Sequence, residues 1–181
     1  MRLANSLALT TAALLACAGP ASSEGLIYEL TAGVLAHDVP DLWSGFQAEH
    51  SAPDINLEVI LRPSYYFLGG AIRPAIGGTI NTRGDTSHGY VDARWQYDTP
   101  FGFYVGLGLG AAIHNGEIGP DGGPDHKWLG SRVLFHIPAE IGYRLDTHNS
   151  VSVYFEHTSN AYTATYNEGM DRIGVRYGYR F

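Results

Sequence analysis

A serine, a histidine and a carboxylate lie near the end of the chain at spacings that suit ester hydrolysis. Residues 151–159 read VSVYFEHTS, and alternate positions carry apolar side chains up to His157 and Ser159. In residues 171–181 the same alternation places Asp171 in phase with Ile173. Successive side chains of a β-strand point to opposite faces, so all three groups share the apolar side of two strands. This placement suggests a hydrolase that acts on a lipid.

The spacing of these groups predicts an activated serine. Residues two apart on a strand are about 6.5 to 7 Å apart along its axis, so His157 can reach Ser159 and an adjacent strand can bring up Asp171. We expect His157 to act as general base, Asp171 to fix its tautomer and the Asn160 amide to bind the oxyanion. The competing interpretation is an interfacial histidine at a strand end, followed by an ordinary loop.

Eight segments of alternating apolar and polar residues supply the strands that would position these groups. They are residues 26–36, 54–62, 72–81, 88–97, 103–113, 132–144, 151–159 and 171–181. Segments of about ten residues, joined by alternately long and short links, are typical of transmembrane barrels. We therefore expect an all-β protein, an eight-stranded antiparallel transmembrane β-barrel of the outer membrane. A soluble β-sandwich or lipocalin is the alternative.

Three features favour the membrane barrel over the soluble one. The polar face of residues 103–113 carries only glycine and alanine beyond Tyr104, which would relieve crowding in a narrow lumen. Aromatic residues gather near the segment ends, as they do at membrane interfaces. The chain also ends on Phe181, in phase with the apolar face. These patterns indicate that the apolar face meets lipid.

The link lengths predict which end of the barrel carries the candidate site. Residues 37–53 and 114–131 form long links, whereas 98–102 and 145–150 form short ones. With a periplasmic N-terminus the long links are extracellular, so the three reactive groups lie at the level of the outer leaflet. Trp43 and Phe46, in the first long link, either shelter an acyl chain or sit at the membrane interface, and we expect the interface.

The N-terminus has the pattern of an export signal. Arg2 precedes a short run of leucine, alanine and threonine, and small residues follow it. We expect residues 1–23 to be a signal peptide for Sec-type export and residues 24–181 to form a single β-barrel domain. A lipoprotein signal ending at Cys17 is the alternative. Since Cys17 is the one cysteine, removal of the signal leaves neither disulfides nor thiolate chemistry.

The charge balance and the loops narrow the functions further. A formal net charge of −7 argues against nucleic acid as a partner, because phosphate binding needs concentrated Lys and Arg. His114, His126, Asp121 and Asp125 lie in the link 114–131, but their spacing matches no closed metal site. We expect this link to be solvated and the protein to need neither a metal nor a cofactor.

The C-terminal residues resemble a known family. The run His157, Thr158, Ser159, Asn160, Ala161, the segment NEGMD at 167–171 and the ending RYGYRF are similar to those of the PagL lipid A 3-O-deacylases. The resemblance implies an outer-membrane barrel that removes the ester-linked 3-hydroxyacyl chain from position 3 of lipid A. It also implies a metal-free serine esterase in which His157, Ser159 and Asn160 keep the family roles.

The acid is where the sequence departs from this family, whose best-known members have glutamate at the position of Asp171. Glu168 is the alternative acid, although it has the wrong parity for the apolar face if the strand already begins there. The expected partners are lipid A or lipopolysaccharide of the outer leaflet, the outer membrane itself and a second copy in a homodimer. The rival function is a non-catalytic small outer-membrane barrel with a structural or adhesion role.

Overall fold

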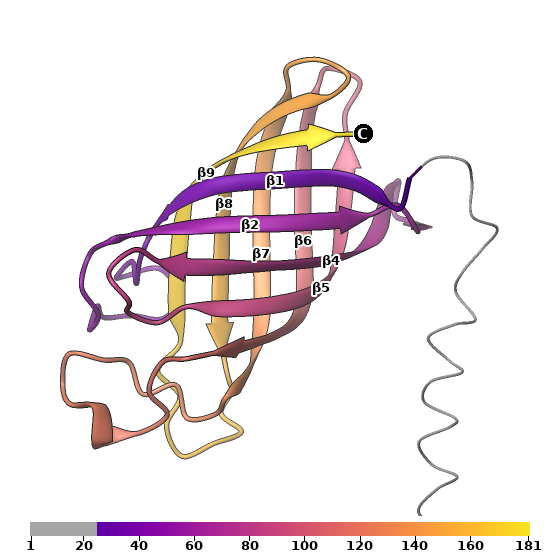
Figure 1. Cartoon of the computed structure of the whole chain (residues 1–181). Coiled ribbons are helices and arrows are strands. Elements are labelled where there is room, and N and C mark those ends of the chain that lie inside the picture. The colour runs from indigo at the N-terminus through magenta and orange to yellow at the C-terminus, as the bar shows by residue number, and fades with distance from the viewer. Residues whose placement is uncertain (1–24) are drawn as a thin grey trace, which may run out of the picture.

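The fold is a closed barrel of antiparallel strands, seen in a computed structural model that describes residues 25–181 (Figure 1). The barrel strands are β1 (Ile27–Ala36), β2 (Pro53–Leu61), β4 (Gly70–Asn81), β5 (His88–Asp98), β6 (Phe103–His114), β7 (Val133–Arg144), β8 (Asn149–Ser159) and β9 (Met170–Arg180). Each pairs with its neighbours, and the pairings of β1 with β9 and of β2 with β4 close the ring. The eight-stranded antiparallel barrel expected from the sequence is confirmed. The signal peptide predicted for residues 1–23 lies outside the described residues.

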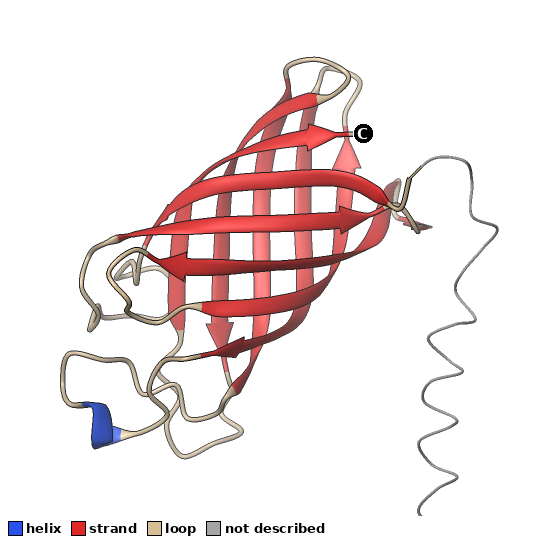
Figure 2. Ribbon diagram, in the orientation of Figure 1, coloured by secondary structure: helices blue, strands red, loops and turns tan. Residues whose placement is uncertain are grey.

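Two short elements lie in the links, and the sequence pattern did not predict them. β3 (Tyr65–Phe67) pairs with β4 as a small hairpin in the link between β2 and β4, and η1 (Pro120–Gly122) is a single 3₁₀ turn, drawn in blue in Figure 2. No helix in residues 25–181 is long and apolar enough to cross a membrane. The strand bounds otherwise match the predicted segments to within about two residues.

The polar faces of the strands point into the barrel and the apolar faces point out. Glu156 and Arg172 are fully buried, whereas Leu107 and Val175 are 56% and 64% exposed. Burial of so many charges is stable only if they are paired. Arg176 accordingly donates to Glu140 at 2.6 Å. The lumen is therefore an ion-pair core, and the exposed apolar wall is what a lipid bilayer solvates.

Glycine on the inner face of β6 makes room for this core. A Cβ at Gly108 would lie 2.6 Å from Pro138 Cγ and 3.0 Å from Arg94 Cδ. A Cβ at Gly110 would lie 2.0 Å from a carboxylate oxygen of Asp92. Since real Cβ atoms do not approach this closely, the lumen has no space for larger residues at these positions.

The long links gather at one end of the barrel, at the lower left of Figure 1, and the C-terminus lies at the other. We call residues 37–52 loop 1, residues 115–132 loop 3 and residues 160–169 loop 4. β8 ends and β9 begins at the loop end, so the strands deliver Ser159 and Asp171 beneath the three loops. The site is built where rigid strands meet these loops.

Candidate active site

The three candidate residues meet at the loop end of β8 and β9. His157 pairs directly with Asp171 across the two strands, because the register sets them opposite each other. His157 Nδ1 lies 2.7 Å from Asp171 Oδ1, and His157 Nε2 lies 3.0 Å from Ser159 Oγ. If Nδ1–H donates to the ionised carboxylate, the Nε2 lone pair faces the serine hydroxyl and can take its proton. The geometry is that of an activated serine.

These groups belong to the outward face but are covered from above. Val151 and Val153, in phase with His157 on β8, are 44% and 48% exposed, whereas His157 is only 4% exposed. Loop 1 causes the difference: the Trp43 ring stacks on the His157 ring with centroids 4.2 Å apart and planes 10° apart. The histidine is thus buried by a loop, on the lipid-facing side, and not in the lumen.

Loop 1 also holds the acid. The main-chain N–H groups of Trp43 and Ser44 both donate to Asp171 Oδ2, each at 2.6 Å. Ser44 Oγ lies 3.3 Å from His157 Nδ1, as a second and longer contact of that nitrogen. Asp171 is fully buried, and both of its oxygens have partners. The shorter acid therefore reaches the imidazole at hydrogen-bond distance.

These loop 1 contacts were not anticipated from the sequence, where Trp43 was expected at the membrane interface. The Trp43 ring packs on the candidate base while the residue stays 60% exposed, so its place at the membrane interface stays a prediction. Phe46 instead packs against Lys127, whose Nζ lies 4.2 Å from its ring centroid. The one signal in the sequence was an aromatic residue in a long loop, and such a residue has many other places to pack.

The Asn160 side chain supports the loops. Its Nδ2 donates to the carbonyl of Leu129 at 2.9 Å and to the carbonyl of Tyr166, which ties loop 4 to loop 3. The side-chain amide is therefore already engaged, and the predicted oxyanion role remains open only to the main-chain N–H. The next two residues, Ala161 and Tyr162, have positive φ values of 52° and 61°. This strained turn begins two residues after the candidate nucleophile.

Glu168, the alternative acid, is used elsewhere. Its Oε2 accepts the main-chain N–H of Trp128 at 2.6 Å, and its own N–H donates back to the Trp128 carbonyl at 3.3 Å. The carboxylate in contact with His157 is that of Asp171. Glu168 thus belongs to the contact between loops 3 and 4.

The candidate metal ligands of the link 114–131 are not brought together as a site. His114 Nε2 contacts the carbonyl of Ser131 at 2.7 Å. Among residues 25–181, the group of side chains that could offer ligands to one ion is His88, His136 and Glu156, in the lumen. His136 is paired there with Asp92 at 2.9 Å and with Glu156 at 3.2 Å. This cluster forms part of the ion-pair core.

His37 and Glu49 form a buried pair in loop 1, and each shifts the pKa of the other. Burial raises the pKa of Glu49, but hydrogen bonds from His37 and Thr86 outweigh burial and lower it to about 2. Burial lowers the pKa of His37, but its hydrogen bonds to Asp54 and Glu49 prevail and raise it. Each group thus favours the charged state of the other, which anchors loop 1 at the lumen end.

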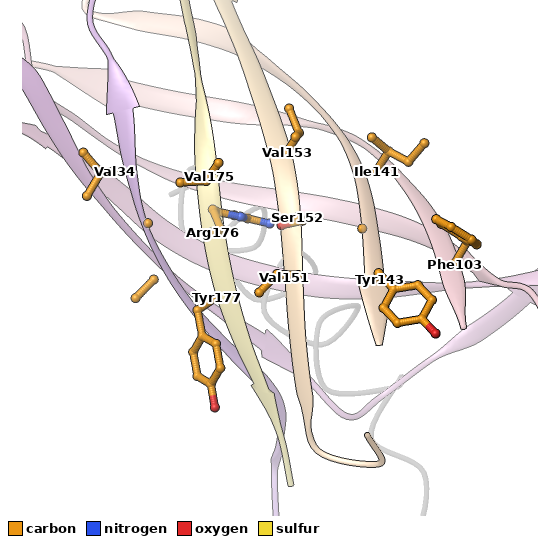
Figure 3. Close-up of a pocket in the computed structure, with 13 residues that line it drawn as sticks. Val34, Phe103, Ile141, Tyr143, Val151, Ser152, Val153, Val175, Arg176 and Tyr177 are labelled. Carbon is orange, nitrogen blue, oxygen red and sulfur yellow. The ribbon is translucent and has the colours of Figure 1, made fainter. Parts of the chain in front are cut away.

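A groove of about 760 Å³ runs along the outer wall on the same strands (Figure 3). Val34, Val175, Val153 and Ile141 form a row across its floor, and the pairing register joins them side by side. This row lies four residues from His157 and Asp171 on β8 and β9, which is about 13 Å along the strands. Apart from the polar edges of Ser152 and Arg176 the lining is apolar, so the groove suits a hydrocarbon chain.

Comparisons with known proteins identify relatives. The family model described as lipid A 3-O-deacylase (PagL) matches residues 47–180. The lipid A deacylase PagL of Bordetella bronchiseptica is 26% identical over 148 residues, covering 81% of this chain and 74% of that protein.

Two solved structures share the fold. The crystal structure of the outer membrane enzyme PagL matches with a TM-score of 0.63 at 18% identity, covering 84% of this chain and 99% of that one. Neisserial surface protein A matches with a TM-score of 0.51 at 12% identity, over 87% and 100% of the two chains. The matched family range includes all three residues of the candidate site.

Proposed function

Because this chain belongs to the lipid A 3-O-deacylase (PagL) family, we propose that it hydrolyses the ester-linked 3-hydroxyacyl chain at position 3 of lipid A in the outer leaflet of the Gram-negative outer membrane. The observation that supports this most is the contact chain Ser159, His157, Asp171 on the lipid-facing wall. Export by the Sec pathway and association into a homodimer remain predictions.

The reaction follows from this geometry. Ser159 Oγ attacks the ester carbonyl while His157 Nε2 takes the hydroxyl proton, and Asp171 stabilises the imidazolium that forms. The tetrahedral intermediate collapses as the imidazolium gives its proton to the departing sugar oxygen, which leaves an acyl-enzyme. Water then attacks with His157 again as base, and a free 3-hydroxy fatty acid is released. The main-chain N–H of Asn160 is the proposed oxyanion donor.

The groove on the outer wall gives the scissile chain a place to lie. Two of its floor residues, Val153 and Val175, sit on β8 and β9, the strands that carry the reactive groups, at greater depth in the membrane. A chain that enters the site at the loop end would extend along these strands toward the groove. Binding of this remote part of the substrate would fix the ester near Ser159.

A serine variant tests the proposal. Purified protein, Ser159→Ala and the control Ser131→Ala would be incubated with lipid A, and the products analysed by mass spectrometry. Ser131 contacts His114 and Val133 and not His157, so its variant should remain active. We expect loss of one 3-hydroxyacyl group with wild type and control, and no loss with Ser159→Ala. Unchanged lipid A in all three would favour the structural or adhesion role, and a new ester in place of free acid would indicate an acyltransferase.

A further inference from the structure

A carboxylate and an imidazole on the outer face of a membrane barrel pose a physical problem. Ionised groups that face hydrocarbon are costly unless hydrogen bonds satisfy them. The strands alone do not solve this, because the neighbours of Asp171 along the outer face of β9 are apolar. Loop 1 supplies the cover that the strands lack, since Asp171 is completely buried beneath it and His157 is only 4% exposed.

The two oxygens of Asp171 have separate tasks. Oδ1 accepts from His157 Nδ1 at 2.7 Å, and Oδ2 accepts from the main-chain N–H groups of Trp43 and Ser44 at 2.6 Å each. Three donors around one carboxylate favour its ionised form and leave it a single orientation. The Trp43 ring then covers the imidazole that this orientation presents to Ser159.

Loop 1 is held in this place by contacts of its own. The carboxylate of Asp38 accepts the N–H groups of Ala48 and Glu49 at 2.8 and 3.0 Å, and Lys127 donates to the carbonyl of Phe46 at 2.5 Å. The N–H of Val39 donates to the main-chain carbonyl of Asp171 at 2.9 Å. The loop is therefore anchored on both sides of Trp43 and Ser44, and its two donors are fixed before any substrate binds.

We propose that Trp43 and Ser44 are positioning residues of the active site, and that the short acid Asp171 is matched to them. Loop 1 fixes the carboxylate through two peptide N–H groups and shields the histidine with an indole ring. This inference rests on the proposed function. The family match begins at residue 47, so the two residues lie outside the range it covers. A glutamate at 171 would need space that loop 1 now fills.

The decisive variant is Asp171→Glu, which introduces the acid of the best-known family members. We expect kcat to fall about tenfold or more, as for loss of one hydrogen bond to a charged group, with KM changed less than about twofold. Trp43→Ala should lower kcat in the same way, and Trp43→Phe, which keeps a ring over His157, should restore most of it. Unheated gel migration would confirm that each variant is a folded barrel.

Labelling of Ser159 by a fluorophosphonate separates this inference from the proposed function. We expect wild type to be labelled and Asp171→Glu and Trp43→Ala to be labelled at least about tenfold more slowly. If wild type is labelled but leaves lipid A intact, the assignment of lipid A as substrate fails and the positioning roles still hold. Asp171→Glu that matches or exceeds wild type, or Trp43→Ala that changes KM alone, would overturn the inference. Wild type that neither reacts with the probe nor deacylates lipid A would overturn both.

Discussion

Replacement of Asp171 by asparagine should disable the site while leaving the barrel intact. Asparagine has the same shape, but it offers one oxygen where the carboxylate offers two. The N–H groups of Trp43 and Ser44 need an acceptor, so that oxygen stays with loop 1 and the new NH₂ group faces His157 Nδ1. Nδ1 must then accept, and the ring proton moves to Nε2.

The magnitude follows from this change of tautomer. A proton on Nε2 points at Ser159 Oγ, 3.0 Å away, and the ring can no longer take the serine proton. Loss of the correct tautomer in a serine triad costs about 10⁴ in kcat, so we expect a fall of about 10³ to 10⁴, or about 4 to 5.5 kcal/mol. Because the wall and the groove are untouched, KM should change little.

The assay is the release of 3-hydroxy fatty acid from lipid A in detergent micelles, with initial rates over a range of substrate concentrations. Glu168→Gln is the matched control, because Glu168 binds the main chain of Trp128 and not His157. Its kcat should stay within about threefold of wild type, as for a change away from the reacting groups. A fall of less than tenfold for Asp171→Asn, or an equal fall for Glu168→Gln, would refute the reasoning.

Three further results are expected. Ala32→Trp, which fills the groove, should lower kcat/KM more for long acyl chains than for short ones, and an equal loss at every length would contradict a chain-binding groove. The ionised Glu49 stabilises loop 1 fully at pH values above its ordinary pKa of 4.5, and this stabilisation is lost as the pH falls toward its lowered pKa of about 2. The protonated His37 stabilises loop 1 fully at pH values below its ordinary pKa of 6.5, and this stabilisation is lost as the pH rises through its raised pKa. Hydrogen exchange of loop 1, corrected for intrinsic rates, should therefore be slowest between pH 4.5 and 6.5, and Glu49→Gln should remove this minimum. Arg176→Met should destabilise the barrel by about 3 to 5 kcal/mol in urea unfolding, because it leaves two buried carboxylates, Glu58 and Glu140, to share one cation, Arg94. A loss below about 1 kcal/mol would count against the ion-pair core.

The strands and the reactive trio were predictable because both depend on local alternation. Parity along β8 and β9 is a property of the sequence, and counting residues is enough to place His157, Ser159 and Asp171 on one face. The small residues on the opposite, polar face of residues 103–113 indicated that this polar face fills a narrow lumen, so the apolar face that carries the three groups points outward.

The loop contributions were not predictable in the same way. Trp43 meets His157 across more than a hundred residues of chain, and no periodic pattern records such a contact. The engagement of Asn160 by carbonyl groups of loops 3 and 4 likewise depends on how those loops fold together. The short strand β3 was missed because its few residues are too short a run to show alternation.

The central claim is that Ser159 forms a covalent acyl-enzyme with the chain it removes from lipid A. The most direct measurement is acid quenching during the first turnovers, followed by mass mapping of the peptide that contains residue 159. The account predicts a 3-hydroxyacyl adduct on Ser159 that disappears as free acid accumulates. Deacylation of lipid A without an adduct on Ser159, and with full activity in Ser159→Ala, would contradict it.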